Sequence, residues 1–366
     1  MGLPNPQLLK ATGRWAQYYK TRIDMTEKSL LLKHGIITDV FDYEFLDDEL
    51  ISTYNFFESR FEELFKSKAE IFKINDYHFY FKHGFGFNAF AKRFKGYNLI
   101  GVTNGYVIHT SKIFHENYFK NIFIAGLKGE KKLSDAFAYL EENPNFKFSS
   151  YMMNCSIEFT FGHEFQHILQ FNSAKINANY EFSENLDESE FSMQKHAWEF
   201  DADRFGSFDV LKYAFEVYRK LNYKNVEILK CLIYAGISSV IITRMLFYLN
   251  VLDPNQKIKV QNFYTKEFSH PHPFIRIFNI LEFSVDSAND LFSELKIETQ
   301  DMLNNTLNIS NIFFKSFLPN ENPLENFFKM LDIKSINLYN NELYEYAVKD
   351  EAIKNLLKTR RINFEE

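Results

Sequence analysis

The sequence predicts an α+β fold that is mainly helical and contains one small antiparallel sheet. Apolar residues recur at helical spacing through most of the chain, whereas short aromatic and β-branched runs follow Tyr77 and are separated by glycine and asparagine. Hydrophobic residues make up 46% and charged residues 25% of the 366 residues, a composition typical of a folded protein with a large core. We expect three regions: residues 1–75, 76–280 and 281–366.

The N-terminal region, residues 1–75, shows helical periodicity and no motif that carries chemistry. Its first residues, MGLPNPQLLKATGRW, lack the apolar core of a signal peptide. The two cysteines, Cys155 and Cys231, lie in apolar stretches, as buried free thiols do. These features predict a cytoplasmic protein.

The charge balance and the hydrophobic runs exclude two classes of partner. Because the net charge is -6, nothing draws the chain in a general way to nucleic acid or to an anionic membrane surface. The longest apolar run, CLIYAGISSVIIT at 231–243, is shorter than the roughly 18 residues that a membrane-spanning helix needs. We therefore expect a buried helix there and no transmembrane segment. From about Leu281 onward the sequence is again helical.

Strands are expected in four runs after Tyr77, with the sequences HFYF, FNAFA, NLIGV and YVIHTSKIF. Residues 103–106 (TNGY) contain the Asn-Gly pair that favours a hairpin turn. We therefore expect an antiparallel sheet, followed by a helix that ends near Phe171. An acidic stretch at 181–190 is expected to be an exposed loop before a second helix, which begins near Ser192.

Residues 161–170, FGHEFQHILQ, lie near the end of the first of these helices. His163 and His167 are four apart, so at 3.6 residues per turn both imidazoles project from one face. Two such imidazoles can bind one zinc ion, and Glu164 can act as general base for a water on the open side of the metal. The alternative is a pair of ordinary helix histidines beside a surface glutamate. With only 10 histidines in the chain, chance rarely produces this spacing.

Zinc bound in this way needs a third protein ligand. Metzincins place glycine and histidine three and six residues after the second histidine, but Gln170 and Ser173 stand there, so that class is excluded. The later segment WEFDADR has Glu199 and Asp203 on one helix face, with His196 on the same face. Glu199 can bind zinc while Asp203 hydrogen-bonds a ligand histidine, and His196 or Asp203 are rival third ligands.

HExxH followed by ExxAD resembles the gluzincin metallopeptidases, especially the HtpX and CAAX-prenyl-protease type. This resemblance favours Glu199 as the third zinc ligand and Asp203 as the residue that supports a ligand histidine. It implies a zincin-like catalytic body with an HExxH active-site helix over residues 76–280. The helical regions on either side would then be additions to that body.

Two further segments resemble the same group. The first resembles the NAFA strand at the edge of the active-site cleft, against which a peptide can add as a further strand. The residues of this segment are Asn88, Ala89, Phe90 and Ala91. The second, SHPHPFIRI, resembles the HPxxxxRI segment, with His270 at its start and Arg276 six residues later. The resemblance implies that His270, or His272 in its place, assists the oxyanion and that Arg276 anchors Asp203 or the chain end.

HtpX-type peptidases have membrane-spanning helices, whereas the Lit type of phage-exclusion peptidase is soluble and has a similar set of motifs. The resemblance to the Lit type covers roughly residues 85–280. We therefore expect a zinc-dependent intracellular endopeptidase that acts on a protein or peptide with a Glu164-activated water, and the Lit type implies cleavage of a host protein in phage defence. The alternatives are a catalytically inactive metal-binding interaction protein on a zincin scaffold and hydrolysis of a non-peptide bond.

Overall fold

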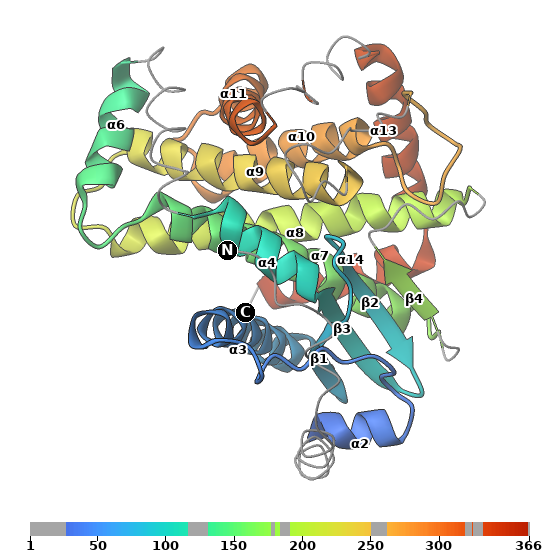
Figure 1. Ribbon diagram of the computed structural model, residues 1–366. Coiled ribbons are helices and arrows are strands. Elements are labelled where there is room, and N and C mark those ends of the chain that lie inside the picture. Colours follow the sequence, from blue (N-terminus) through green and yellow to red (C-terminus); the bar gives the residue numbers. More distant parts are fainter. Residues whose placement is uncertain are drawn as a thin grey trace.

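The computed structural model of the protein describes residues 27–115, 131–176, 180–183, 191–249, 262–318, 324 and 332–364. Helices predominate in this part of the chain, and four strands form one sheet (Figure 1). The prediction of a mainly helical α+β fold is therefore confirmed at this level. The N-terminal residues for which no signal peptide was predicted lie outside the described residues.

The sheet has the strand order β1-β3-β2-β4 and is mixed. β1 runs parallel to β3, whereas β2 is antiparallel to both β3 and β4. The expected antiparallel arrangement is therefore wrong for the β1–β3 pair. The strands are β1 (Tyr77–Lys82), β2 (Ala89–Phe94), β3 (Tyr97–Thr103) and β4 (Tyr180–Ser183).

The hairpin turn of the sheet lies between β2 and β3, at Lys95 and Gly96. Phe94 pairs with Tyr97 across these two residues. Both turn residues have positive φ, 48° at Lys95 and 90° at Gly96, as a type I′ turn requires. The Lys-Gly pair therefore joins the second and third predicted strands, a different connection from the predicted Asn-Gly turn.

The predicted turn at 103–106 is instead the start of helix α4 (Asn104–Ile113), so the fourth expected strand is also a helix. The Thr103 side chain caps this helix by accepting a hydrogen bond from the Tyr106 backbone nitrogen. A Cβ at Gly105 would lie 2.3 Å from the Phe85 carbonyl oxygen, so glycine is needed for a close approach of two backbone segments.

Helices α7, α8 and α9 cross the centre of the molecule, with α3 and the sheet on one side and α10, α11 and α13 on the other (Figure 1). Helix α14 packs on α7, and α6 packs on α9. Besides α4, the helices have the following bounds: α2 (Glu27–Lys33), α3 (Asp48–Phe72), α6 (Lys131–Glu142), α7 (Phe148–Ser173), α8 (Met193–Lys220), α9 (Val226–Leu249), α10 (Pro273–Leu291), α11 (Thr299–Phe317), α13 (Ile333–Ala347) and α14 (Glu351–Phe364).

Alternate residues of the strands pack on opposite faces of the sheet, as the two-residue period of a strand requires. One face contributes to the main core. The other face forms a smaller cluster with α2 and the segment after it. The residues of the smaller cluster are Leu31, Ile36, Ile37, Tyr80, Phe90 and Leu99. The main core contains residues from α3 through α14, so all three predicted regions contribute to it.

Helix α9 contains the apolar run 231–243. By length and composition it could cross a membrane, but 83% of its most apolar window is buried inside the protein. Such burial is compatible with the central helix of a soluble fold, as predicted. Cys155 and Cys231 are both buried and free, which confirms the prediction for the two thiols.

Candidate metal centre

Helices α7 and α8 approach each other closely at two glycines. A Cβ at Gly206 of α8 would lie 2.7 Å from the Phe159 carbonyl oxygen and 3.2 Å from the His163 backbone nitrogen. A Cβ at Gly162 of α7 would lie 3.0 Å from Gly206 Cα. Because neither position has a side chain, the two backbones come close enough for side chains of α8 to reach the histidines of α7.

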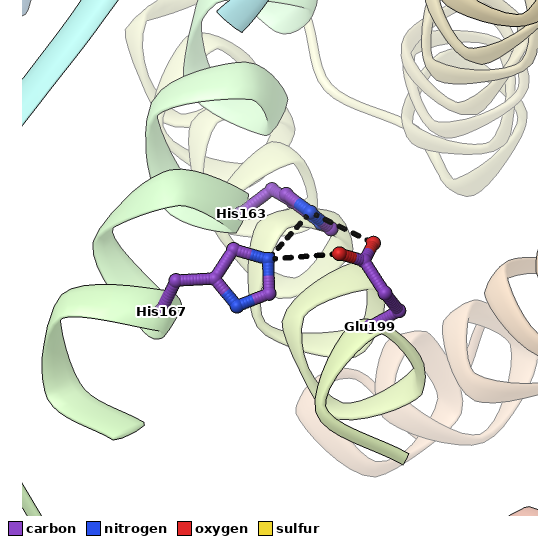
Figure 2. A group of neighbouring side chains, drawn as sticks. All are labelled: His163, His167 and Glu199. Atoms are coloured by element: carbon purple, nitrogen blue, oxygen red, sulfur yellow. Dashed lines mark hydrogen bonds and ion pairs between the residues drawn. The ribbon is translucent and has the colours of Figure 1, made fainter. Parts of the chain in front are cut away.

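His163, His167 and Glu199 point toward one another across this contact (Figure 2). The two Nε2 atoms are 3.1 Å apart, and each lies 3.3 Å from one oxygen of Glu199. Bonds of about 2.0–2.2 Å at tetrahedral angles would place neighbouring zinc ligands roughly 3.3–3.6 Å apart. Each of the three side chains is only 1% exposed. The donor set therefore fits zinc in atom type and burial, and its His–Glu199 separations lie in this range while the Nε2–Nε2 distance is slightly shorter.

The second ring nitrogen of each histidine lies beside a polar side chain. His163 Nδ1 is 3.1 Å from Asp203 Oδ1, and His167 Nδ1 is 2.8 Å from Gln170 Oε1. Gln170 in turn donates a hydrogen bond to the Trp198 carbonyl oxygen at 3.0 Å. An acceptor at Nδ1 favours the tautomer with its proton on that atom, which leaves the Nε2 lone pair for a metal. Asp203 thus lies where the sequence placed it, and Gln170 is an addition.

Arg276 lies against both carboxylates of α8. Its Nη2 is 2.6 Å from Glu199 Oε2 and 2.7 Å from Asp203 Oδ1, and its Nε donates to Asp203 Oδ2 at 2.7 Å. Burial raises the pKa of Glu199, but Arg276, His270 and the two α7 histidines together hold that pKa well below its usual range. Glu199 is therefore a carboxylate, the form that binds a metal.

Of the two histidines before α10, His270 faces the centre. Its Nε2 lies 3.4 Å from Glu199 Oε1. His272 instead caps α10, because its Nδ1 accepts a hydrogen bond from the Phe274 backbone nitrogen at 3.2 Å. The His272 ring also packs edge-on against Tyr264, with the ring centroids 4.9 Å apart. The structure thus separates two residues that the sequence left as alternatives.

His196, the rival third ligand, has other partners. Its Nε2 lies 2.7 Å from the Phe268 carbonyl oxygen, and its Nδ1 lies 2.9 Å from the Tyr339 hydroxyl oxygen. Burial lowers the pKa of His196 to about 4, so the ring is neutral near pH 7. Its contacts tie α8 to the segment before α10 and to α13, which gives His196 a structural place outside the donor set.

Two residues near the centre were not predicted. Arg244 of α9 has its Nη2 3.6 Å from Asp203 Oδ1 and 4.0 Å from Glu199 Oε2. Phe182 of β4 stacks on the His167 ring, with centroids 4.6 Å apart and an angle of 5° between the planes. The only sequence signal for Arg244 is a charged residue directly after the longest apolar run, and Phe182 has no signal within its acidic stretch.

Glu164, the predicted general base, follows His163 on α7 and is 1% exposed. It is near enough to Tyr106 of α4 for its charge to add to the effect of burial, which raises the pKa of Tyr106 to about 12. The Tyr106 hydroxyl donates to Thr160 Oγ1 at 3.1 Å, one helical turn before Glu164. Glu164 is therefore buried on α7 near the contact with α4.

The NAFA-like segment lies inside the sheet. Asn88 precedes β2, and Ala89, Phe90 and Ala91 belong to it. At Phe90 and Ala91, β2 pairs with β3 on one side and with β4 on the other. The prediction that a peptide adds as a strand is therefore wrong at Phe90 and Ala91, where β4 occupies that edge, and it stays a prediction for Asn88 and Ala89. β4 begins the stretch that was expected to be a loop, of which residues 184–190 lie outside the described residues.

Comparison with known proteins identifies no relative. No protein-family model, curated protein or solved structure matches the chain. The likeness to the gluzincin peptidases is carried by the sequence motifs alone.

Proposed function

We propose that the protein is a zinc-dependent endopeptidase that hydrolyses peptide bonds in a protein substrate. One observation carries the proposal: the Nε2 atoms of His163 and His167 and the carboxylate of Glu199 form a buried donor set with separations that suit zinc. Glu164 directly follows His163 in the sequence and is buried, and a purely structural metal site needs no such base. The motifs therefore agree with the chemistry of the side chains.

The residues that surround the donor set would position and charge it. Asp203 holds the imidazole of His163 through Nδ1, and Gln170 does the same for His167. Arg276 contacts Glu199 and Asp203 and so holds both carboxylates in place, and its charge favours the ionised form of Glu199. These contacts would keep the donors close to the geometry that a bound ion requires.

When bound, zinc supplies Lewis acidity, which polarises the scissile carbonyl and lowers the pKa of water. Glu164 accepts the proton of the attacking water and delivers it to the leaving amine. His270, whose Nε2 lies beside Glu199 Oε1, donates a hydrogen bond to the substrate carbonyl oxygen as negative charge develops there. The whole reaction thus needs one base and one donor from this chain.

The test of this function is the substitution Glu164→Gln, with Glu216→Gln at an exposed position of α8 as the matched control. Purified wild type and both variants should each hold one zinc ion, measured by atomic emission after dialysis. Proteolysis by Glu164→Gln should fall by roughly 10²–10⁴-fold, the usual contribution of a general base, whereas Glu216→Gln should cleave like wild type. Full activity of Glu164→Gln would refute the proposed mechanism.

The proposed setting is the cytoplasm, with one specific host protein as the substrate during phage infection. The support for this setting is the likeness to the Lit type. Cells that express wild type or Glu164→Gln, with and without phage challenge, would be compared by proteomics for new protein termini. Termini that appear only with wild type would identify the substrate, and termini independent of phage would remove the role in defence.

A second candidate function is a catalytically inactive metal-binding protein. It is favoured by the burial of all three donor side chains and by the stacking of Phe182 on His167. Wild-type protein that holds zinc but produces no new termini in any condition would support this function. Retention of zinc together with cleavage that depends on Glu164 would exclude it.

A further inference from the structure

A recess lies next to the donor set, between the end of α9 and the segment before α10. Its lining residues are Arg244, Phe247, Tyr248, His270, Pro271, Pro273 and Arg276. Two guanidinium groups and one imidazole therefore share this recess with aromatic and proline side chains. His270 and Arg276 also contact Glu199, so the recess adjoins the centre directly.

The two arginines of the recess differ in how closely they approach the carboxylates of α8. Arg276 contacts both at 2.6–2.7 Å, whereas the nearest distance from Arg244 Nη2 is 3.6 Å, to Asp203. Arg244 is 4% exposed, and its guanidinium lies 5.6 Å from the ring centroid of Phe159. Arg276 thus contacts Glu199 and Asp203 directly, and Arg244 adds a second positive charge at a longer distance from these carboxylates.

The charges at the centre are unequal once a metal is present. Two carboxylates lie there, those of Glu199 and Asp203, against the guanidiniums of Arg244 and Arg276. A divalent cation changes the sum of these charges from zero to two positive. A buried charge without a partner is costly, so the loaded centre favours an added anion, and the recess offers the place for it.

We infer that this recess binds a carboxylate of the substrate and that Arg244 determines this specificity. The inference rests on the proposed function and names its substrate class: a peptide with an acidic side chain near the scissile bond. A guanidinium forms charge-assisted, paired hydrogen bonds with a carboxylate, and the walls formed by Phe247 and Pro273 suit the aliphatic part of aspartate or glutamate.

The test uses two zinc-binding probes, N-hydroxysuccinamic acid and its carboxamide analogue, which differ only in the charge of the distal group. Calorimetry on zinc-loaded wild type should show the acid binding at least about tenfold more tightly, as one charge-assisted contact provides. Arg244→Gln should reduce that ratio to below about threefold without weakening the carboxamide, and Arg244→Lys should retain part of it. Lys230→Gln, on the same helix, should keep the wild-type ratio.

The outcomes separate the recess from the proposed function. Equal binding of the two probes by wild type, or a ratio that survives Arg244→Gln, would overturn the inference. Failure of both probes to bind would overturn the zinc centre and the inference with it. Selective binding of the acid by a protein that cleaves no substrate would retain the recess and refute the peptidase.

The source of the carboxylate is decided by capped peptides on zinc-loaded Glu164→Gln protein. The peptide acetyl-Ala-Ala-Asp-Ala-Ala-amide should bind more tightly than its Asn counterpart, and this difference should disappear in the double variant with Arg244→Gln. An all-alanine peptide with a free C-terminal carboxylate should bind no better than its amide. Preference for the free chain end would overturn the assignment to an acidic side chain.

Discussion

The α7–α8 helix pair and the β2–β4 edge of the sheet both border the donor set, but they hold it in different ways. The helices supply His163, His167 and Glu199, and they place polar side chains beside the Nδ1 atoms of both imidazoles. The sheet supplies no ligand and contacts the centre by the stacking of Phe182 on His167. The helix pair therefore supplies the donor atoms, and the sheet edge covers the His167 ring with the Phe182 ring.

This difference follows from the range of the interactions. The helical spacing of HExxH brings its two histidines together within one turn, whatever the rest of the fold does. The partner of β2 comes from a distant stretch, and a strand has no internal feature that selects its neighbour. A motif on a helix is thus a safer guide to a site than a motif on a strand.

The largest effect on stability is expected from a substitution that forces α7 and α8 apart at their closest contact. Gly206→Ala should lower the free energy of unfolding by about 3 kcal/mol, the upper end of overpacking costs, because the added Cβ meets backbone atoms of α7. It should also weaken zinc binding, since Glu199 would move away from the histidines. Urea unfolding and zinc titration measure both, with Glu216→Ala on the exposed side of α8 as control. Equal stability of the two variants would contradict the close contact.

A smaller effect is expected where a helix side chain fixes a ligand. Gln170→Leu removes the acceptor at His167 Nδ1 and should weaken zinc binding by roughly 10–100-fold, the usual cost of losing such a support. Gln166→Leu is the matched control, because Gln166 and Gln170 both donate to Asp201 Oδ2, whereas the contact at His167 Nδ1 comes from Gln170. Competition with a chelator of known affinity measures the difference. Equal affinities of the two variants would deny Gln170 its role.

The third prediction concerns the effect of pH on His272, the residue that caps α10. Burial lowers the pKa of His272 to about 4, below the value of about 6.5 in an unfolded chain, so the folded state keeps this ring neutral. The stability from this group is therefore complete above about pH 6.5 and is lost as the pH falls toward 4.

Between pH 7.5 and 6 the loss from His272 should be about 1 kcal/mol. His272→Asn, which keeps an acceptor for the Phe274 nitrogen, should give a correspondingly flatter stability profile. Urea unfolding of metal-free protein at several pH values measures this slope without interference from metal binding, and the difference between wild type and variant isolates His272. Identical slopes for wild type and variant would contradict the assignment.

The smallest effect on zinc is expected at the sheet edge. Phe182→Ala removes the ring from His167 but leaves the hydrogen bond to Gln170, so zinc affinity should change by less than about threefold. Faster amide exchange in β4 should accompany it, because an edge strand with fewer apolar contacts opens more readily. Titration and hydrogen exchange test the two parts. A loss of zinc affinity as large as that of Gln170→Leu would abolish the distinction between helix pair and sheet.

Much of the donor set could be predicted from the sequence. His163 and His167 follow from local helical geometry, and Asp203 follows from its position one turn after Glu199 on the same face. Less of the sheet could be predicted, because Asn104-Gly105 fits a hairpin turn as well as the start of a capped helix. The Thr103 cap and the packing of the segment before Gly105 together favour the helix.

The sequence by itself determined the pairing of His163 and His167, since the spacing within a helix decides which atoms share a face, whereas the contacts of His196 with Phe268 and Tyr339 separate it from Glu199. Only the tertiary structure decided that His270 faces Glu199 while His272 caps α10, that Arg244 joins the centre, and that β4 covers β2. These outcomes depend on how segments far apart in the chain pack against one another. Packing of that kind is selected by the whole core and by no single local pattern.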